Sequence, residues 1–305
     1  MKIFNNHKIS KKYKKSSLAI GNFDGVHKGH QKVFKYAKRN AQKNRQRFGI
    51  LTFSPLPVMF FNKKIKNYRL TSEKDKFFLL KKCGVNFIVN IKFNKSFSKI
   101  SAENFIKNII FKKINPSEIF VSNNFKFGNK RKGDINLLKT LSKNYNYKLL
   151  KVNPYKTRKK LISSSRIRKC IEAGNVSLAN KMLSRTWFIE GKVIKGKKLG
   201  RKLGYRTCNI RIKNYVLPRV GIYAVRVLIV NKKKIFKGVA YLGSRPTFSG
   251  KETFLEINIF GFKKNLYKKK LKVYFLKFIR GDIKFSSSAK LVRQMNRDVI
   301  LAKKV

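Results

Sequence analysis

The chain has 305 residues, enough for one large or two ordinary domains, and its 42% hydrophobic residues with 26 Phe exclude a disordered protein. Its net charge of +64, from 76 Lys and Arg against 12 Asp and Glu, favours anionic ligands. Three isolated cysteines exclude a disulfide framework, and the basic start lacks the apolar segment of a secretory signal. No apolar run is long enough to span a membrane, so we expect a cytoplasmic protein without a membrane partner.

The first predicted unit is a buried strand followed by a glycine turn and a helix. Residues 18–20 form a short apolar run, and the apolar side chains after the turn recur at helical spacing. His27 and His30 stand three apart in the expected first helical turn, so they share one face. A helix N-terminus attracts anions, and Gly21 and Gly25 let a ligand approach the backbone. The stretch predicts a phosphate site; surface histidines on an ordinary turn are the alternative.

Residues 21–30 read Gly-Asn-Phe-Asp-Gly-Val-His-Lys-Gly-His. This string resembles the His-x-Gly-His signature of nucleotidyltransferases, and more particularly the adenylyltransferase half of bacterial bifunctional riboflavin kinase/FAD synthetases. The resemblance implies that His27 and His30 are catalytic, holding ATP phosphates and stabilising the pentavalent α-phosphorus. It also implies that the turn binds ATP through Gly21, Phe23, Asp24 and Gly25.

The rest of the first half alternates strands with helices, the pattern of a Rossmann-like parallel sheet. Beyond the strand at residue 18, which we take as the first, strands are expected at 48–53, 85–91 and 119–121, and helices at 77–82, 101–110 and 135–142. Pro55 and Pro57 close the second strand at its carboxyl end, where ligands of open α/β sheets bind.

Two later segments carry further candidate nucleotide residues. The loop at 122–134 is rich in amides and cations, and a solvated turn explains it equally well. In the resemblance, Asn124 stands where the family has an Asp or Asn near the nucleotide. The segment 162–168 opens a helix with Ser163, Ser164 and Ser165, which could serve as an N-cap or, with Arg168, bind a triphosphate. It resembles the family segment that closes on ATP phosphates.

The pattern changes near residues 184–187, and short β segments follow with no long helix between them. They lie at 188–194, 205–212, 221–230, 235–242, 254–260 and 271–278, which predicts a closed six-stranded antiparallel barrel. A helix at 287–302 should pack against it, after a helical pair that ends near residue 183. We therefore predict an adenylyltransferase domain at 1–185 and a riboflavin kinase domain at 186–305, as the resemblance implies.

The barrel begins with a glycine-rich, cationic loop. Gly196, Gly200 and Gly204 are spaced by four, which suits a loop over a polyphosphate but also occurs in tight turns between barrel strands. Thr207 and Asn209 alternate on one face of the next strand and could hold Mg²⁺, since hard oxygen ligands suit that ion. In the resemblance, the glycines belong to the kinase ATP site and Thr207 and Asn209 match its Mg-ATP residues.

The resemblance makes Glu256 the kinase's catalytic base, which would take the proton from the riboflavin 5′-hydroxyl; an exposed strand carboxylate is the alternative. The chain departs from the family pattern nearby. Arg206 replaces a Pro, Cys208 replaces an Ala, and two acidic positions appear as Gly261 and Gly281.

The resemblance predicts two reactions: ATP-dependent phosphorylation of riboflavin to FMN, and adenylylation of FMN by ATP to FAD and pyrophosphate, with Mg²⁺ as cofactor. Two alternatives stay open. One is an FMN adenylyltransferase with an impaired kinase barrel. The other is an RNA-binding protein that uses its basic surface, although the basic residues are spread along the whole chain and specific nucleic-acid binding is not expected. The sequence leaves oligomerisation open.

Overall fold

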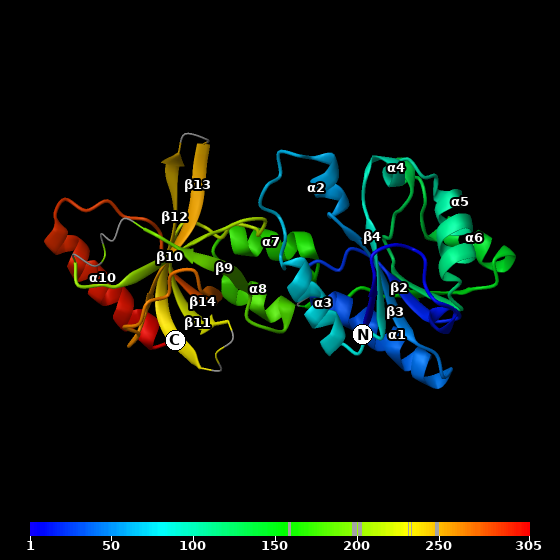
Figure 1. Ribbon diagram of the computed structural model, residues 1–305, viewed down its shortest axis with the longest axis horizontal. Coiled ribbons are helices and arrows are strands. Elements are labelled where there is room, and N and C mark those ends of the chain that lie inside the picture. Colours follow the sequence, from blue (N-terminus) through cyan, green and yellow to red (C-terminus); the bar gives the residue numbers. More distant parts are fainter. Residues whose placement is uncertain (158–159, 197–199, 201–202, 231, 233, 248–249) are drawn as a thin grey trace. The chain divides into compact units, whose positions relative to one another are not determined.

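The computed structural model describes residues 1–157, 160–196, 200, 203–230, 232, 234–247 and 250–305. The chain forms two compact units (Figure 1): the first is residues 1–66 with 73–163, and the second is residues 67–72 with 164–305. The division therefore falls at Ser163–Ser164, earlier than the predicted domain limit at residue 185. A six-residue segment from the first half also belongs to the second unit.

The first unit is built on a parallel sheet of six strands in the order β1-β4-β3-β2-β5-β6. The strands are β1 Lys2–Phe4, β2 Ser17–Ile20, β3 Phe48–Ser54, β4 Phe87–Lys92, β5 Glu118–Ser122 and β6 Lys148–Val152. The strand order reverses between β2 and β5, which makes their carboxyl ends a topological switch point, the usual place for a ligand. This confirms the predicted α/β class.

The expectation that the first strand lies at residue 18 is wrong, because β1 precedes it and pairs with β4 at the sheet edge. A strand of three residues carries no measurable hydrophobic alternation. Strand β6 was also not expected, because two of its five residues are lysines.

Helices cover both faces of this sheet, because alternate residues of each strand point to opposite faces. On one face, Ala19 and Ile50 pack with side chains of α1 Lys28–Lys43 and α3 Glu73–Lys82. On the other, Leu18 and Leu51 pack with α6 Ile135–Asn144 and with the π-helix Phe105–Ile114, which continues α5 Ala102–Asn104. Shorter elements are α2 Pro57–Phe61, α4 Lys95–Ser98, 3₁₀ turns at Lys11–Tyr13 and Asn129–Arg131, and the strand pair β7 Lys156–Thr157 and β8 Lys160–Leu161.

The second unit holds a closed antiparallel barrel in the order β10-β13-β12-β11-β14-β9, as predicted. Its strands are β9 Phe188–Ile194, β10 Thr207–Arg211, β11 Gly221–Ile229, β12 Ile235–Thr247, β13 Gly250–Ile259 and β14 Lys270–Arg280. Strand β12 continues to Thr247, beyond its expected end at residue 242, and β13 begins at Gly250, before its expected start at residue 254, so the two strands form a long hairpin.

Two helices before the barrel pack with it rather than with the sheet. They are α7 Ser164–Glu172 and α8 Val176–Leu183. Asn180 Nδ2 on α8 donates to the carbonyl of Phe275 at 2.8 Å, and Ser177 Oγ donates to that of Leu276 at 3.1 Å, both on β14. These bonds explain why the units divide before α7.

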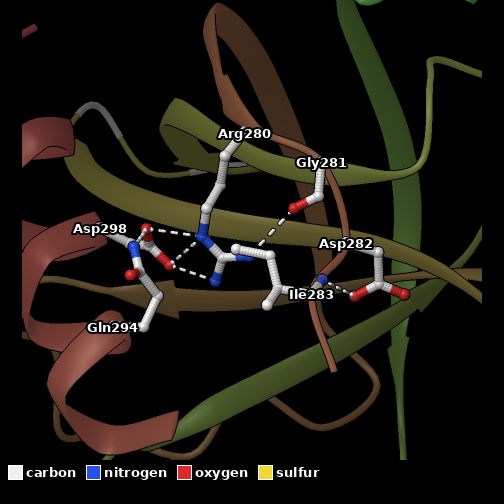
Figure 2. Close-up of polar contacts among 6 residues, drawn as sticks. All are labelled: Arg280, Gly281, Asp282, Ile283, Gln294 and Asp298. Carbon is white, nitrogen blue, oxygen red and sulfur yellow. Dashed lines mark hydrogen bonds and ion pairs between the residues drawn. The ribbon is translucent and has the colours of Figure 1, made fainter. Parts of the chain in front are cut away.

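The C-terminal helix α10, Ser288–Lys303, is fixed to the barrel by a bidentate ion pair (Figure 2). Arg280, at the end of β14, donates from Nε at 3.0 Å and from Nη2 at 2.7 Å to the Asp298 carboxylate. Gln294 Nε2 adds a bond of 3.0 Å to the same carboxylate. Asp298 is only 2% exposed, so the pair is a buried anchor for the helix.

Candidate nucleotide sites

The predicted histidine loop lies at the switch point of the first unit. It leaves the sheet after β2 through a tight turn in which Phe23, Gly25 and Val26 have φ of 49°, 84° and 44°. His27 is the N-cap of α1 rather than part of its first turn, and its Nδ1 accepts from the backbone N–H of His30 at 3.3 Å. The two imidazoles stack with centroids 3.6 Å apart. The structure thus brings both histidines together at a helix N-terminus.

Phe23 and Asp24, predicted in the same site, are both buried. The Phe23 ring meets the edge of the His30 ring at 5.2 Å and also packs on Phe34. A Cβ on Gly21 would lie 3.0 Å from Phe23 Cζ, so the ring fills the space under the turn. Phe23 therefore supports the loop from the core side.

At Gly29, which lies between the two histidines in the sequence, the backbone comes close to Ile162 of a distant segment. A Cβ at this position would lie 3.1 Å from His27 Nδ1 and 3.3 Å from the carbonyl oxygen of Ile162. The first residue of the predicted serine segment therefore lies beside the histidine pair, and Ser163 follows it. Sequence reasoning did not select Gly29, although its place inside the motif could have indicated a close approach.

The other members of the serine segment belong to the second unit. Ser164 and Ser165 begin α7, and Arg168 lies one turn later. Arg168 is 6% exposed, and its Nε donates to the carbonyl of Tyr68 at 2.8 Å.

The predicted loop after β5 borders a cavity in the first unit. Because β5 pairs with β2, this loop leaves the same sheet edge as the histidine loop, from the neighbouring strand. Asn124 is exposed, accepts from Ser122 Oγ at 3.1 Å, and lines a cavity of about 330 Å³ with Lys126 and Asp134. Backbone N–H donation from Leu137 and a bond from Lys126 lower the pKa of Asp134, which caps α6.

The predicted kinase residues meet on two paired barrel strands. Asn209 on β10 stands directly opposite Glu256 on β13, and Thr207 stands opposite Asn258, so all four share one face. Thr207 Oγ1 donates to Glu256 Oε1 at 2.6 Å. Asn209 Oδ1 is buried and accepts no hydrogen bond from the described residues. The face therefore combines a carboxylate, a hydroxyl and an amide oxygen with unused acceptor capacity.

Two glycines of the preceding loop close against these side chains. A Cβ at Gly196 would lie 2.1 Å from Asn209 Nδ2, and one at Gly200 would lie 3.2 Å from Thr207 Oγ1. Gly204 has φ of 84°, and a Cβ there would have no described atom within 4 Å. Between them, residues 197–199 and 201–202 lie outside the described part of the chain. Only glycine fits at 196 without displacing Asn209.

A cavity of about 310 Å³ opens beside Thr207. Its lining is about half apolar and half polar, with a lysine-bearing loop at one side: Val193, Arg206, Thr207, Cys208, Ile257, Ile259, Phe262, Lys263, Lys264, Asn265, Leu266 and Tyr267. Burial raises the pKa of the Cys208 thiol to about 12, so Cys208 lines the cavity as a neutral group. Sequence reasoning missed the cavity because its walls come from three strands and a distant loop.

Arg206 stands where the family has a Pro, and two hydrogen bonds hold its side chain and its backbone. Its Nη1 donates to the carbonyl of Lys263 at 2.9 Å, and its own carbonyl accepts from Asn258 Nδ2 at 2.8 Å. These two bonds fix the backbone where the loop joins β10, the position at which a proline ring would restrict φ.

Comparisons with known proteins agree in both halves of the chain. A family model described as FAD synthetase matches residues 9–166, and one described as riboflavin kinase matches residues 183–305. A protein of Buchnera aphidicola subsp. Schizaphis graminum, described as bifunctional riboflavin kinase/FMN adenylyltransferase, is 40% identical over 98% of this chain and 96% of its own length. A protein of Escherichia coli K12 with the same description is 32% identical over 94% and 91%.

A solved structure described as a macrolide-efflux protein from Streptococcus pneumoniae has the same fold. It superposes with a TM-score of 0.84 at 29% identity, covering 97% of this chain and 96% of its own. In the described part of the present chain, no helix has the length and apolar character needed to cross a membrane.

Proposed function

The chain belongs to the family of bifunctional riboflavin kinases/FMN adenylyltransferases, and from that premise we propose which of its residues carry each reaction. The enzyme phosphorylates riboflavin to FMN with ATP and transfers AMP from a second ATP to FMN, which gives FAD and pyrophosphate. Both steps are displacements at phosphorus, so positioning and charge neutralisation supply most of the catalysis. The observation that carries the proposal is the shared face of Thr207, Asn209 and Glu256.

In the kinase reaction, Glu256 is the general base. Its carboxylate takes the proton of the riboflavin 5′-hydroxyl as that oxygen attacks the γ-phosphorus, and ADP leaves. The Thr207 hydroxyl fixes one carboxylate oxygen through its 2.6 Å bond. In the cavity of about 310 Å³ beside Thr207, the apolar part of the lining, which includes Ile257 and Phe262, suits the adenine ring of ATP.

The oxygen atoms of this face fit a magnesium ion. Asn209 Oδ1 is buried and has no hydrogen-bond donor among the described residues, and a hydroxyl that donates its proton to a carboxylate keeps its lone pairs for a cation. Thr207 and Asn209 would hold Mg²⁺, which neutralises phosphate charge when bound. Gly196, Gly200 and Gly204 let the preceding loop come close enough to cover the phosphates.

In the adenylyl transfer, His27 and His30 stabilise the charge that develops on the α-phosphoryl oxygens. Their stacked rings and the N-terminus of α1 present donors at the switch point of the sheet. Gly21 and Gly25 leave the backbone open to ATP, Asp24 and Phe23 hold the turn in shape, and Asn124 contributes from the neighbouring strand end. Ser163, Ser164, Ser165 and Arg168 bind the leaving pyrophosphate.

We assign the adenylyl transfer to residues 1–185 and the phosphorylation to residues 186–305. The FAD synthetase model matches residues 9–166, and the riboflavin kinase model matches residues 183–305. We place the enzyme in the cytoplasm, where ATP is available and where its free cysteines Cys83, Cys170 and Cys208 would stay reduced.

One incubation tests the proposal. Riboflavin, ATP and Mg²⁺ are mixed with the protein, and the flavins are separated by chromatography. FMN and FAD should both appear, and a chelator should stop both. FAD formed from added FMN but no FMN formed from riboflavin would instead identify an adenylyltransferase with an impaired kinase barrel.

A further inference from the structure

The turn that carries His27 begins where β2 leaves the sheet, and Thr52 of the neighbouring strand β3 lies at that point. Gly21 N–H donates to the carbonyl of Leu51 at 3.1 Å, which extends the backbone pairing of β2 and β3 by one bond. One residue further along each segment, Thr52 Oγ1 donates to the carbonyl of Asn22 at 3.1 Å. The Thr52 side chain therefore continues, into the turn, the contact that the backbone of β3 makes with β2.

Lys76 fixes the direction of the Thr52 hydroxyl. Lys76 Nζ, on α3, donates to Thr52 Oγ1 at 3.0 Å, and the two residues are only 2% and 0% exposed. A lysine ammonium has donors and no acceptor, so the Thr52 oxygen accepts this bond and directs its own proton elsewhere. The Asn22 carbonyl receives that proton. Two successive hydrogen bonds therefore link α3 through β3 to the histidine turn, and all of these residues belong to the first unit.

The backbone of this turn needs contacts that hold it in place. Phe23 and Val26 have φ of 49° and 44°, a region that residues with a Cβ rarely adopt, and β-branched residues least of all. Such a backbone persists only where its surroundings fix it. At the other end of the turn, Gln31 Nε2 donates to the carbonyl of Val26 at 2.8 Å. The side chains of Thr52 and Gln31 thus hold the two ends of the segment that precedes His27.

We propose that Thr52 is a positioning residue for the adenylyl transfer: its hydroxyl holds the turn that places His27 and His30 against the α-phosphoryl group of ATP. The inference rests on the proposed role of the two histidines. Thr52 is fully buried, so it acts through the turn and not on the substrate. Displacement of a catalytic group by about 1 Å can lower a rate by about a hundredfold. Loss of the hydroxyl should therefore slow the chemical step more than it weakens the binding of ATP.

Three substitutions of Thr52 in the full-length protein test the inference by FAD formation from FMN at varied ATP concentration. Thr52→Val replaces the hydroxyl with a methyl group of similar size. The kcat should fall about tenfold or more, while the KM for ATP should change less than about threefold. Thr52→Ala places no methyl group beside Lys76 Nζ; it should show the same loss and carries the test if Thr52→Val does not fold. Thr52→Ser keeps the hydroxyl and should stay within about threefold of the wild type.

The matched control is Thr140→Val on α6. Thr140 is exposed, and its Oγ1 also donates to a backbone carbonyl, that of Asn136, at 3.1 Å. This variant should keep the wild-type rate of FAD formation. Riboflavin phosphorylation should be unchanged in the control and in all three Thr52 variants.

A second readout follows the histidines without catalysis. The chain has three histidines, and His7 lies beside Lys113 rather than in the turn. In proton–carbon NMR spectra of the histidine rings, Thr52→Val should shift the signals of His27 and His30 and leave that of His7 in place. Thr52→Ser should return the signals close to their wild-type positions, and the control variant should shift none of them.

Several outcomes would overturn the inference. It fails if Thr52→Val and Thr52→Ala keep the wild-type kcat, or if Thr52→Ser is as impaired as they are. It also fails if the signals of His27 and His30 stay in place, or if riboflavin phosphorylation falls in parallel with FAD formation, as a merely structural role would require. His30→Ala tests the function separately: if it still forms FAD from FMN, the proposed role of the histidines fails and the inference fails with it, even where Thr52→Val shifts the signals.

Discussion

The Thr207 hydroxyl donates a 2.6 Å hydrogen bond to Glu256 Oε1, from one strand of the barrel to its neighbour. Asn209 stands directly opposite Glu256 in the same strand pair. One of the chain's 12 acidic side chains is therefore held beside a neutral hydroxyl and a neutral amide. This arrangement places the proposed general base directly beside the two proposed metal ligands, on one face of the strand pair.

The close approach of Gly196 to Asn209 predicts a selective kinase defect. In Gly196→Ala, the new Cβ would lie 2.1 Å from Asn209 Nδ2, so the amide must move. The KM for Mg-ATP in riboflavin phosphorylation should rise at least about tenfold, since metal ligation depends on ligand placement. FAD formation from FMN should be unaffected. Gly281→Ala, whose Cβ would lie 3.9 Å from its nearest neighbour, is the control. A wild-type KM in Gly196→Ala would contradict the metal site.

His27 caps helix α1, and we propose that it also stabilises the reacting phosphate. The variant His27→Asn separates these two roles. Asparagine is a good N-cap, so it should replace the acceptor for the His30 N–H and leave thermal stability within about 0.5 kcal/mol of the wild type. Without the imidazole, FAD formation from FMN should fall by about a hundredfold or more. Thermal denaturation and an FMN adenylylation assay check the two parts. Full FAD formation in this variant would mean that His27 serves only as a helix cap.

Because the ion pair between Arg280 and Asp298 is buried, we expect that loss of one partner destabilises the barrel and that apolar replacement of both partners restores much of the stability. Asp298→Ala leaves the guanidinium without its carboxylate, and the free energy of unfolding of the barrel should fall by roughly 3 kcal/mol. Replacing both partners, as Arg280→Met with Asp298→Leu, should recover much of that loss. Asp282→Asn, at an exposed neighbour in Figure 2, is the control. Urea denaturation gives the values; an Asp298→Ala protein as stable as the control would show that the pair does not anchor α10.

Because the Cys208 thiol is buried, we expect it to resist alkylation in the folded protein. Because its pKa is raised to about 12 from 9.0, the thiol stays protonated well above neutral pH. At pH 8 only about one molecule in ten thousand would carry the reactive thiolate. Iodoacetamide should therefore leave Cys208 unmodified in the folded protein and alkylate it after urea unfolding, as followed by peptide mass spectrometry. Rapid labelling in the folded state would contradict the cavity wall described here.

The motifs could be predicted from the sequence because each is local. The histidine turn, the serine segment and the Thr207–Asn209 pair each depend on neighbours a few residues apart. The barrel strands alternate clearly enough to be recognised, which is why its six-stranded closure was predicted correctly.

Contacts between distant residues could not be predicted in this way. The register that sets Glu256 opposite Asn209 depends on strand pairing, and the Tyr68–Arg168 contact joins positions 100 residues apart. Strand β1 was not predicted, because three residues are too few to show a periodic hydrophobic pattern. The placement of α7 and α8 with the barrel follows from side-chain bonds to β14 carbonyls, which sequence periodicity does not encode.

The most direct test of two separate phosphate sites on one chain is a crossed assay of Glu256→Gln and His30→Ala. Each variant is given riboflavin with ATP, and separately FMN with ATP, and the flavins are quantified by chromatography. Glu256→Gln should lose FMN formation by at least about a hundredfold and still convert FMN to FAD, whereas His30→Ala should form FMN and fail to form FAD. If both variants remain folded and each loses both reactions, the assignment of separate sites is contradicted.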